Sequence, residues 1–183
     1  MLNYNKVEMR YEPYPLAVLR PALDAAQYGL LADNFPDESL FGTLPKFPYK
    51  LSLSEKWNPA NYRKFLRENK PWNAFHSWIK SDEFIRQTVE FLNSNHVELP
   101  LQDAFESSSQ RLRRAARALK RGYLPSRGVR LRSRFEFSSL RADGGRVEPH
   151  TDAARKVITL VLTMIKDGEW QTAWGGGLDV NTT

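Results

Sequence analysis

Residues 130–180 read RLRSRFEFSSLRADGGRVEPHTDAARKVITLVLTMIKDGEWQTAWGGGLDV. Polar and apolar residues alternate from Arg130 to Ser138, which predicts a strand with one face turned to the core. The glycine pair Gly144-Gly145 predicts a turn, and the apolar run from Val157 to Leu162 predicts a second strand. This part of the chain is therefore expected to be rich in β-structure.

Two candidate metal ligands, His150 and Asp152, lie between these predicted strands. Alternate residues of a strand point to the same face, so both side chains could reach one ion. A histidine and a carboxylate are two of the three ligands in the facial triad of non-haem iron oxygenases. Because H-x-D is frequent by chance, the prediction of a metal site depends on the sequence around it. The alternative is an incidental pair at the exposed end of a strand.

The order of these features resembles the 2-oxoglutarate- and iron(II)-dependent oxygenases, in particular their prolyl-hydroxylase-like branch. In that branch a strand, a glycine turn and H-x-D precede a basic residue, a strand with a central threonine, a tryptophan and Gly-Gly-x-Leu. The matching features here are Phe135–Leu140, Gly144-Gly145, His150-Thr151-Asp152, Lys156, Ile158-Thr159-Leu160, Trp170 and Gly176-Gly177-Leu178. The resemblance covers residues 130–180.

The resemblance implies an α+β protein with a double-stranded β-helix core, a jelly roll of the cupin-like kind. It implies that His150 and Asp152 hold Fe(II) and are the catalytic pair, and that the protein uses 2-oxoglutarate and O2 to hydroxylate a C–H bond. Lys156 and Thr163 are the positions at which it suggests contacts with the cosubstrate. Related halogenases replace the carboxylate, so Asp152 favours hydroxylation over halogenation.

The chain departs from the family pattern in several places. The family's second histidine and its cosubstrate-binding arginine lie further downstream than Thr183, where this sequence stops. Tyrosines common in the family are replaced by Leu140 and Thr163. His76 stands among aromatic residues and is predicted to pack, and His96 falls in a predicted loop, so neither is taken as the third ligand.

The predicted jelly-roll core is incomplete. The family core has eight strands, of which about four or five can be predicted after Arg130. An open sheet would leave an unpaired edge, which proteins normally cover. Three explanations are open: a longer natural chain, which we favour, a partner chain that completes the barrel, or a degenerate member of the family.

The preceding region, residues 1–129, is predicted to be a mainly helical support for the core region 130–183, within one domain. Its predicted features are a short strand at residues 16–19, a helix at 21–33, a loop at 35–49, helices at 59–69 and 72–80, and helices starting at 81 and near 111. Asn58-Pro59 and Ser81 are typical helix starts. Gly122 is predicted to end the last helix.

Composition narrows the class of protein. The 183 residues contain no cysteine, which excludes disulfides and thiolate metal sites. No run approaches the roughly 18 apolar residues of a membrane helix, so a cytoplasmic protein without a membrane partner is expected. The net charge is +6, and residues 111–134 hold ten lysines and arginines and no acidic residue.

The basic segment suggests a second function from another class, a non-catalytic interaction module with a degenerate oxygenase-like barrel. Such a module would bind an acidic partner or nucleic acid, but the segment lacks aromatic interleaving or a known nucleic-acid motif, which disfavours nucleic acid. In an oxygenase the substrate would be a small molecule or a peptidyl residue. Arg132 and Arg134 are predicted to face solvent, or else to hold an anionic substrate.

Overall fold

The computed structural model describes residues 2–45, 47–97, 99, 131–141, 156–166 and 168–174, and single residues 113, 116, 147, 150 and 152. The expected α+β class is confirmed, because within these described residues four complete α-helices accompany two small antiparallel sheets. The chain divides into two compact units. Met1–Ser77 and Phe135–Thr183 form the first unit, and Trp78–Arg134 forms the second.

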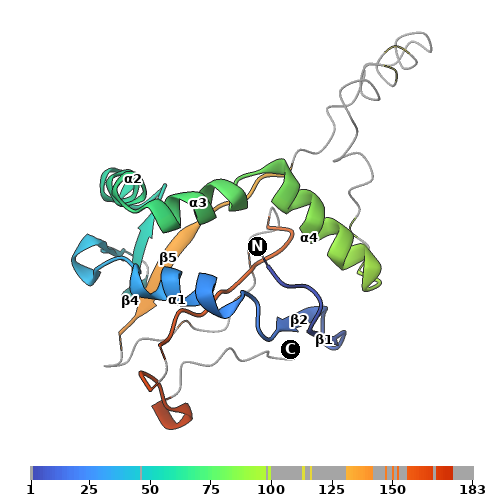
Figure 1. Ribbon diagram of the computed structural model, residues 1–183, viewed down its shortest axis with the longest axis horizontal. Helices are drawn as coiled ribbons and strands as arrows, with labels where there is room; N and C mark the ends of the chain where they lie inside the picture. Colours follow the sequence, from blue (N-terminus) through green and yellow to red (C-terminus); the bar gives the residue numbers. More distant parts are fainter. Residues whose placement is uncertain are drawn as a thin grey trace. The chain divides into compact units, whose positions relative to one another are not determined.

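The larger sheet joins segments far apart in the sequence. It has the order β3 (Gly42–Leu44), β4 (Phe47–Ser54), β5 (Glu136–Leu140), with both neighbouring pairs antiparallel. Figure 1 shows β4 and β5 side by side. The smaller sheet pairs β1 (Val7–Arg10) with β2 (Leu16–Leu19), which confirms the strand predicted at residues 16–19. The strands of the described ranges form no closed barrel, so they do not establish the jelly roll.

The loop predicted at residues 35–49 is wrong. This segment contains a 3-10 helix, η1 (Glu38–Leu40), the whole of β3 and the start of β4. Prolines suggested the loop, but Pro45 occupies the turn between the strands. The pairing of β4 with β5 begins at Lys50, after Pro48. The missing N–H of Pro48 therefore removes no hydrogen bond between these two strands.

The helices follow local start signals. The predicted helices appear as α2 (Pro59–Glu68), α3 (Lys70–Ile79) and α4 (Asp82–Ser94). The Ser81 hydroxyl caps α4 by accepting a hydrogen bond from the Phe84 N–H at 3.2 Å. Asn58 begins α2 without a side-chain cap bond. Its amide instead donates to the Leu40 carbonyl at 2.8 Å and so ties η1 to the start of α2.

Helix α1 (Ala25–Asp33) starts later than predicted. Asp24 is the cap, because its carboxylate accepts a hydrogen bond from the Gln27 N–H at 2.8 Å. On this helix Leu31 is buried whereas Leu30 is exposed. An Asp followed three residues later by Gln is a capping-box pattern, and it could have located this start.

Of the two strands predicted around the H-x-D sequence, the first begins later than predicted, and the prediction of the second is wrong. Residues 131–135 precede β5 without being part of a strand, and residues 156–166 contain no strand. A strand needs a neighbour for its backbone groups, and the described residues place none beside 156–166. The predicted alternation nevertheless holds before and within β5, because Arg132 and Arg134 are exposed whereas Phe137 is buried.

Phe137 is the centre of an aromatic core in the first unit. It is 3% exposed, and its ring lies 4.8 Å from that of Trp72 and 5.4 Å from that of Phe65, centroid to centroid. The Trp72 indole N–H donates to the Leu31 carbonyl of α1 at 3.0 Å. These contacts join α1, α2 and α3 to β5 and bury the inner face of the sheet.

Several predicted features lie outside the described residues. They include the glycine turns at 144–145 and 175–177, and most of the helix predicted from residue 111, of which Arg113 and Ala116 are described and helical. Within the described ranges, no helix has the length and apolar character needed to cross a membrane.

Candidate functional site

His150 and Asp152 lie close together, although neither belongs to a strand. The His150 Nε2 is 3.8 Å from the Asp152 Oδ1. Both side chains are accessible, with 54% of the imidazole and 36% of the carboxylate exposed. The predicted proximity therefore arises from the local path of the chain rather than from strand geometry.

Asp152 is also held by two residues that follow it. Lys156 Nζ donates to Oδ1 at 2.5 Å, and Thr159 Oγ1 donates to Oδ2 at 2.7 Å. These two hydrogen bonds, with that of Lys156 the stronger influence, lower the pKa of Asp152 below its ordinary value. The group is thus a carboxylate near neutral pH, the form that binds a cation.

The pair is compatible with one metal ion. Two ligand atoms that each lie about 2.1 Å from the same ion are roughly 3 Å apart when the ligand–ion–ligand angle is about 90°. Their greatest separation, reached when they lie on opposite sides of the ion, is about 4.2 Å. The observed 3.8 Å is within that limit. An ion on Oδ1 would compete with Lys156 for this oxygen. No group of three or more potential metal-binding side chains occurs within the part of the chain that the structure describes.

The two residues predicted to contact the cosubstrate differ in position. Lys156 reaches the pair through its bond to Asp152. Thr163 is exposed, and within the described ranges no hydrogen bond joins it to His150 or Asp152. The structure therefore brings Lys156, but not Thr163, into the candidate site, and adds Thr159, which the sequence suggested only as part of a strand.

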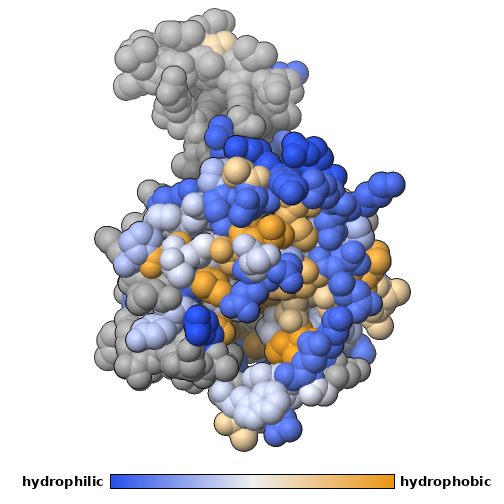
Figure 2. Space-filling model, turned by 90° about the vertical axis from the view of Figure 1, so that its left-hand side faces the viewer, coloured by the Kyte–Doolittle hydropathy of each residue, from blue (hydrophilic) through white to orange (hydrophobic). Residues whose placement is uncertain are grey.

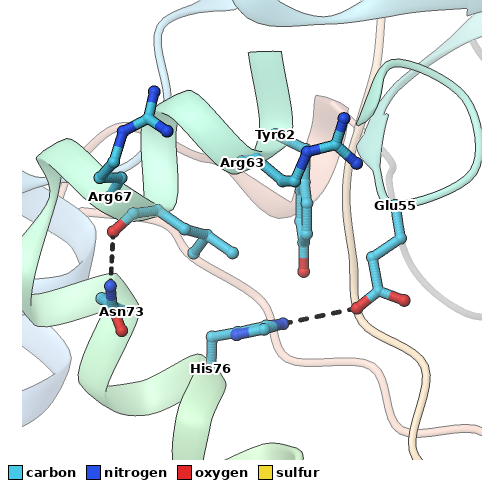
Figure 3. Close-up of a pocket in the computed structure, with 7 residues that line it drawn as sticks. Glu55, Tyr62, Arg63, Arg67, Asn73 and His76 are labelled. Carbon is cyan, nitrogen blue, oxygen red and sulfur yellow. Dashed lines mark hydrogen bonds and ion pairs between the residues drawn. The ribbon is translucent and has the colours of Figure 1, made fainter. Parts of the chain in front are cut away.

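A separate cavity of about 520 Å³ lies in the first unit (Figure 3). Its lining combines charged, polar and apolar side chains: Glu55, Tyr62, Arg63, Leu66, Arg67, Asn73 and His76. Helices α2 and α3 supply all of these except Glu55, which follows β4. The Asn73 amide donates to the Leu66 carbonyl at 3.0 Å and so ties the two helices together at the cavity.

His76 packs in this cavity, as its aromatic neighbours in the sequence predicted. Its ring makes edge-on contacts with Tyr62 and Phe135, each at 5.7 Å between centroids. Its Nε2 lies 3.6 Å from the Glu55 carboxylate. No sequence pattern connects His76 with Glu55, because the turn after β4 brings the carboxylate there.

Tyr62 is the most buried polar group of the cavity. The residue is 2% exposed, and its hydroxyl has no hydrogen-bond partner among the described residues. Burial, and secondarily the negative charge of Glu55, raise the pKa of the phenol well above its ordinary value. Tyr62 therefore presents a neutral hydroxyl that can still donate a hydrogen bond.

Comparison with protein-family models, curated proteins and solved structures finds no match to this chain.

Proposed function

We propose that this chain belongs to an iron(II)- and 2-oxoglutarate-dependent dioxygenase that hydroxylates its substrate. The observation that carries the proposal is the His150–Asp152 pair, in the order H-x-D, with Nε2 and Oδ1 3.8 Å apart. Support comes from the surrounding sequence order and from the low pKa of Asp152, which keeps the carboxylate charged. When bound, iron(II) with 2-oxoglutarate and O2 supplies the oxidising power for C–H hydroxylation.

The chain's own residues have distinct roles in this proposal. His150 and Asp152 would hold the metal, His150 as the neutral ligand and Asp152 as the charged one. Thr159 fixes the orientation of the carboxylate through Oδ2, which is the kind of outer hydrogen bond that tunes metal ligands. Lys156, which donates to Oδ1 here, is the nearby cation that would contact the anionic cosubstrate. Thr163 remains a proposed cosubstrate contact.

Within the observed α+β class, the fold that we propose is a jelly-roll core. Further residues or a partner chain would complete it. Its support is the apolar run from Val157 to Val161, which is exposed at most positions and reaches 69% exposure at Val161. Exposed apolar runs of this kind mark surfaces that another element covers. Slow amide hydrogen exchange in this run would support the pairing, whereas fast exchange would contradict it.

The direct test is an anaerobic titration with Fe(II) and 2-oxoglutarate that follows the visible charge-transfer band of the chelate. Wild type should develop the band, and His150→Ala should not. His96→Asn is the matched control, because it removes an exposed histidine of the second unit and keeps a residue suited to its backbone. A folded wild-type protein without the band would contradict the proposal.

The second candidate is the basic interaction module, proposed to act in the cytoplasm like the oxygenase. In the described part of its segment, Arg113 and Arg132 are exposed. The module predicts binding to an acidic partner that falls steeply with salt and survives His150→Ala. Metal-dependent binding that His150→Ala abolishes would favour the oxygenase instead.

A further inference from the structure

We propose that the cavity between α2 and α3 binds a small organic anion, one carboxylate or phosphate on a compact apolar body. The site shares no residue with the His150–Asp152 pair and does not depend on the proposed oxygenase activity. Its volume of about 520 Å³ falls in the range of roughly 300–1,000 Å³ that is usual for ligand pockets.

The buried hydroxyl of Tyr62 is the first sign of a ligand. Buried polar groups in folded proteins nearly always have a hydrogen-bond partner, and a missing partner needs an explanation. Figure 3 shows the Tyr62 hydroxyl directed into the cavity, toward His76. Because its pKa is raised, the phenol keeps its proton and serves as a donor to an acceptor atom of the ligand.

Two arginines give the cavity its preference for negative charge. Arg63 and Arg67 are one helical turn apart on α2, so they line the same face. Both are exposed, and neither forms an ion pair with the described residues. Guanidinium groups bind carboxylates and phosphates with paired hydrogen bonds. In Figure 3 the two guanidinium groups stand apart from each other, on the side away from the Tyr62 hydroxyl, so these exposed side chains must turn toward the anionic group to hold it where the cavity opens to solvent.

The remaining lining limits the ligand to one anionic end. Leu66 and the Tyr62 ring provide an apolar wall. At the other side, the carboxylate of Glu55 lies 3.6 Å from His76 Nε2 (dashed line in Figure 3) and would repel a second negative charge. Figure 2 looks onto the side of the molecule that carries α2 in Figure 1, where hydrophobic patches reach the surface between hydrophilic side chains.

The test uses benzoate and phenyl phosphate as probes and follows amide shifts in two-dimensional NMR. At least one probe should shift signals of α2 and α3 in a saturable manner, and the tighter probe identifies carboxylate or phosphate as the preferred group. Arg63→Gln and Arg67→Gln should each weaken binding about tenfold, because a charge-assisted bond is lost. Tyr62→Phe should weaken it about fivefold.

Two controls separate this site from general charge attraction. Lys64→Gln changes the charge of α2 at an exposed position that does not line the cavity, so it should leave both affinities unchanged. Benzamide, the neutral relative of benzoate, should not bind. The proposal is overturned if neither probe causes saturable shifts, if benzamide binds as well as benzoate, or if Lys64→Gln weakens binding as much as Arg67→Gln.

Discussion

At the scale of single residues, the Tyr62 hydroxyl should destabilise the folded protein, and its removal should show by how much. A buried hydroxyl without a partner destabilises the fold, so Tyr62→Phe should raise the free energy of unfolding by about 1 kcal/mol. Urea unfolding at neutral pH measures this change. Tyr28→Phe is the matched control, because the Tyr28 hydroxyl donates to the Ile165 carbonyl at 2.5 Å and accepts from its N–H at 2.7 Å.

Tyr28→Phe should lower the free energy of unfolding by about 1–2 kcal/mol, since it leaves partly buried backbone groups of Ile165 without this partner. Equal losses in the two variants would mean that the Tyr62 hydroxyl is satisfied in solution. The cavity would then lose its main sign of a ligand. If Tyr62→Phe is more stable but binds benzoate or phenyl phosphate less tightly, then Tyr62 serves ligand binding at the expense of stability.

The same residue predicts a pH dependence with a definite sign. Folding raises the pKa of Tyr62 through burial and the charge of Glu55, so the unfolded chain loses this proton first as the pH rises. Above the unfolded pKa of about 10, wild type should lose roughly 1.4 kcal/mol of stability per pH unit relative to Tyr62→Phe. Urea unfolding of both proteins between pH 8 and pH 11 measures the divergence, and parallel curves would contradict it.

Residue identity predicted part of the candidate sites. The H-x-D spacing correctly placed His150 near Asp152, because two residues cannot separate them far in any conformation. The contacts of Asp152 with Lys156 and Thr159 join residues four and seven positions apart. No periodic pattern links these positions, so the sequence could not specify the contacts.

At the scale of elements, helix α4 ends with a backbone geometry that its sequence does not favour. His96 has a φ of 57°. The N–H of His96 donates to the Asn93 carbonyl at 3.1 Å, and that of Val97 donates to the Leu92 carbonyl at 2.9 Å, which is a Schellman cap. Glycine is the residue that usually occupies this position.

His96→Gly should therefore raise the free energy of unfolding by about 1 kcal/mol, because the left-handed conformation costs other residues roughly 1–2 kcal/mol. Thermal unfolding measures the gain. The control is Ser94→Gly, which places the same flexible residue inside the last turn of α4 and should destabilise the protein by about 0.5–1 kcal/mol. A loss of stability in His96→Gly would show that this cap is absent in solution.

Helices proved more predictable than strands in this chain. Caps such as Ser81 act within one turn, so their signal is contained in a few adjacent residues. The strands β3 and β4 depend on pairing with each other and, for β4, with the distant β5. The apolar run from Val157 has strong strand character, but the part of the chain that the structure describes offers it no pairing neighbour.

At the scale of the whole molecule, the first unit is closed by contacts between distant parts of the sequence. Phe137 of β5 lies opposite Leu53 of β4 and packs its ring between residues of α2 and α3. Alternation predicted that Phe137 would be buried, but not which elements would cover it. Those partners follow from tertiary packing, which a single sequence pattern does not encode.

Phe137 should therefore contribute far more stability than an exposed aromatic residue of the same unit. Phe137→Ala should lower the free energy of unfolding by about 3–5 kcal/mol, through lost burial and the cavity left behind. Phe137→Leu keeps most of the volume and should cost about half as much or less. Trp174→Ala is the control, because Trp174 is 61% exposed and its loss should change stability by less than about 0.5 kcal/mol.

Urea denaturation followed by far-ultraviolet circular dichroism compares the four proteins without relying on the altered aromatic signals. If Phe137→Ala cost no more than Trp174→Ala, the aromatic core would not hold β5 to the helices in solution. The cavity between α2 and α3 would then lack its support, because Tyr62 lines the cavity and also packs against Phe137, with ring centroids 6.3 Å apart. If Phe137→Ala loses much stability and Phe137→Leu loses little, the anion site rests on a tightly packed core. A preorganised pocket requires such a rigid framework.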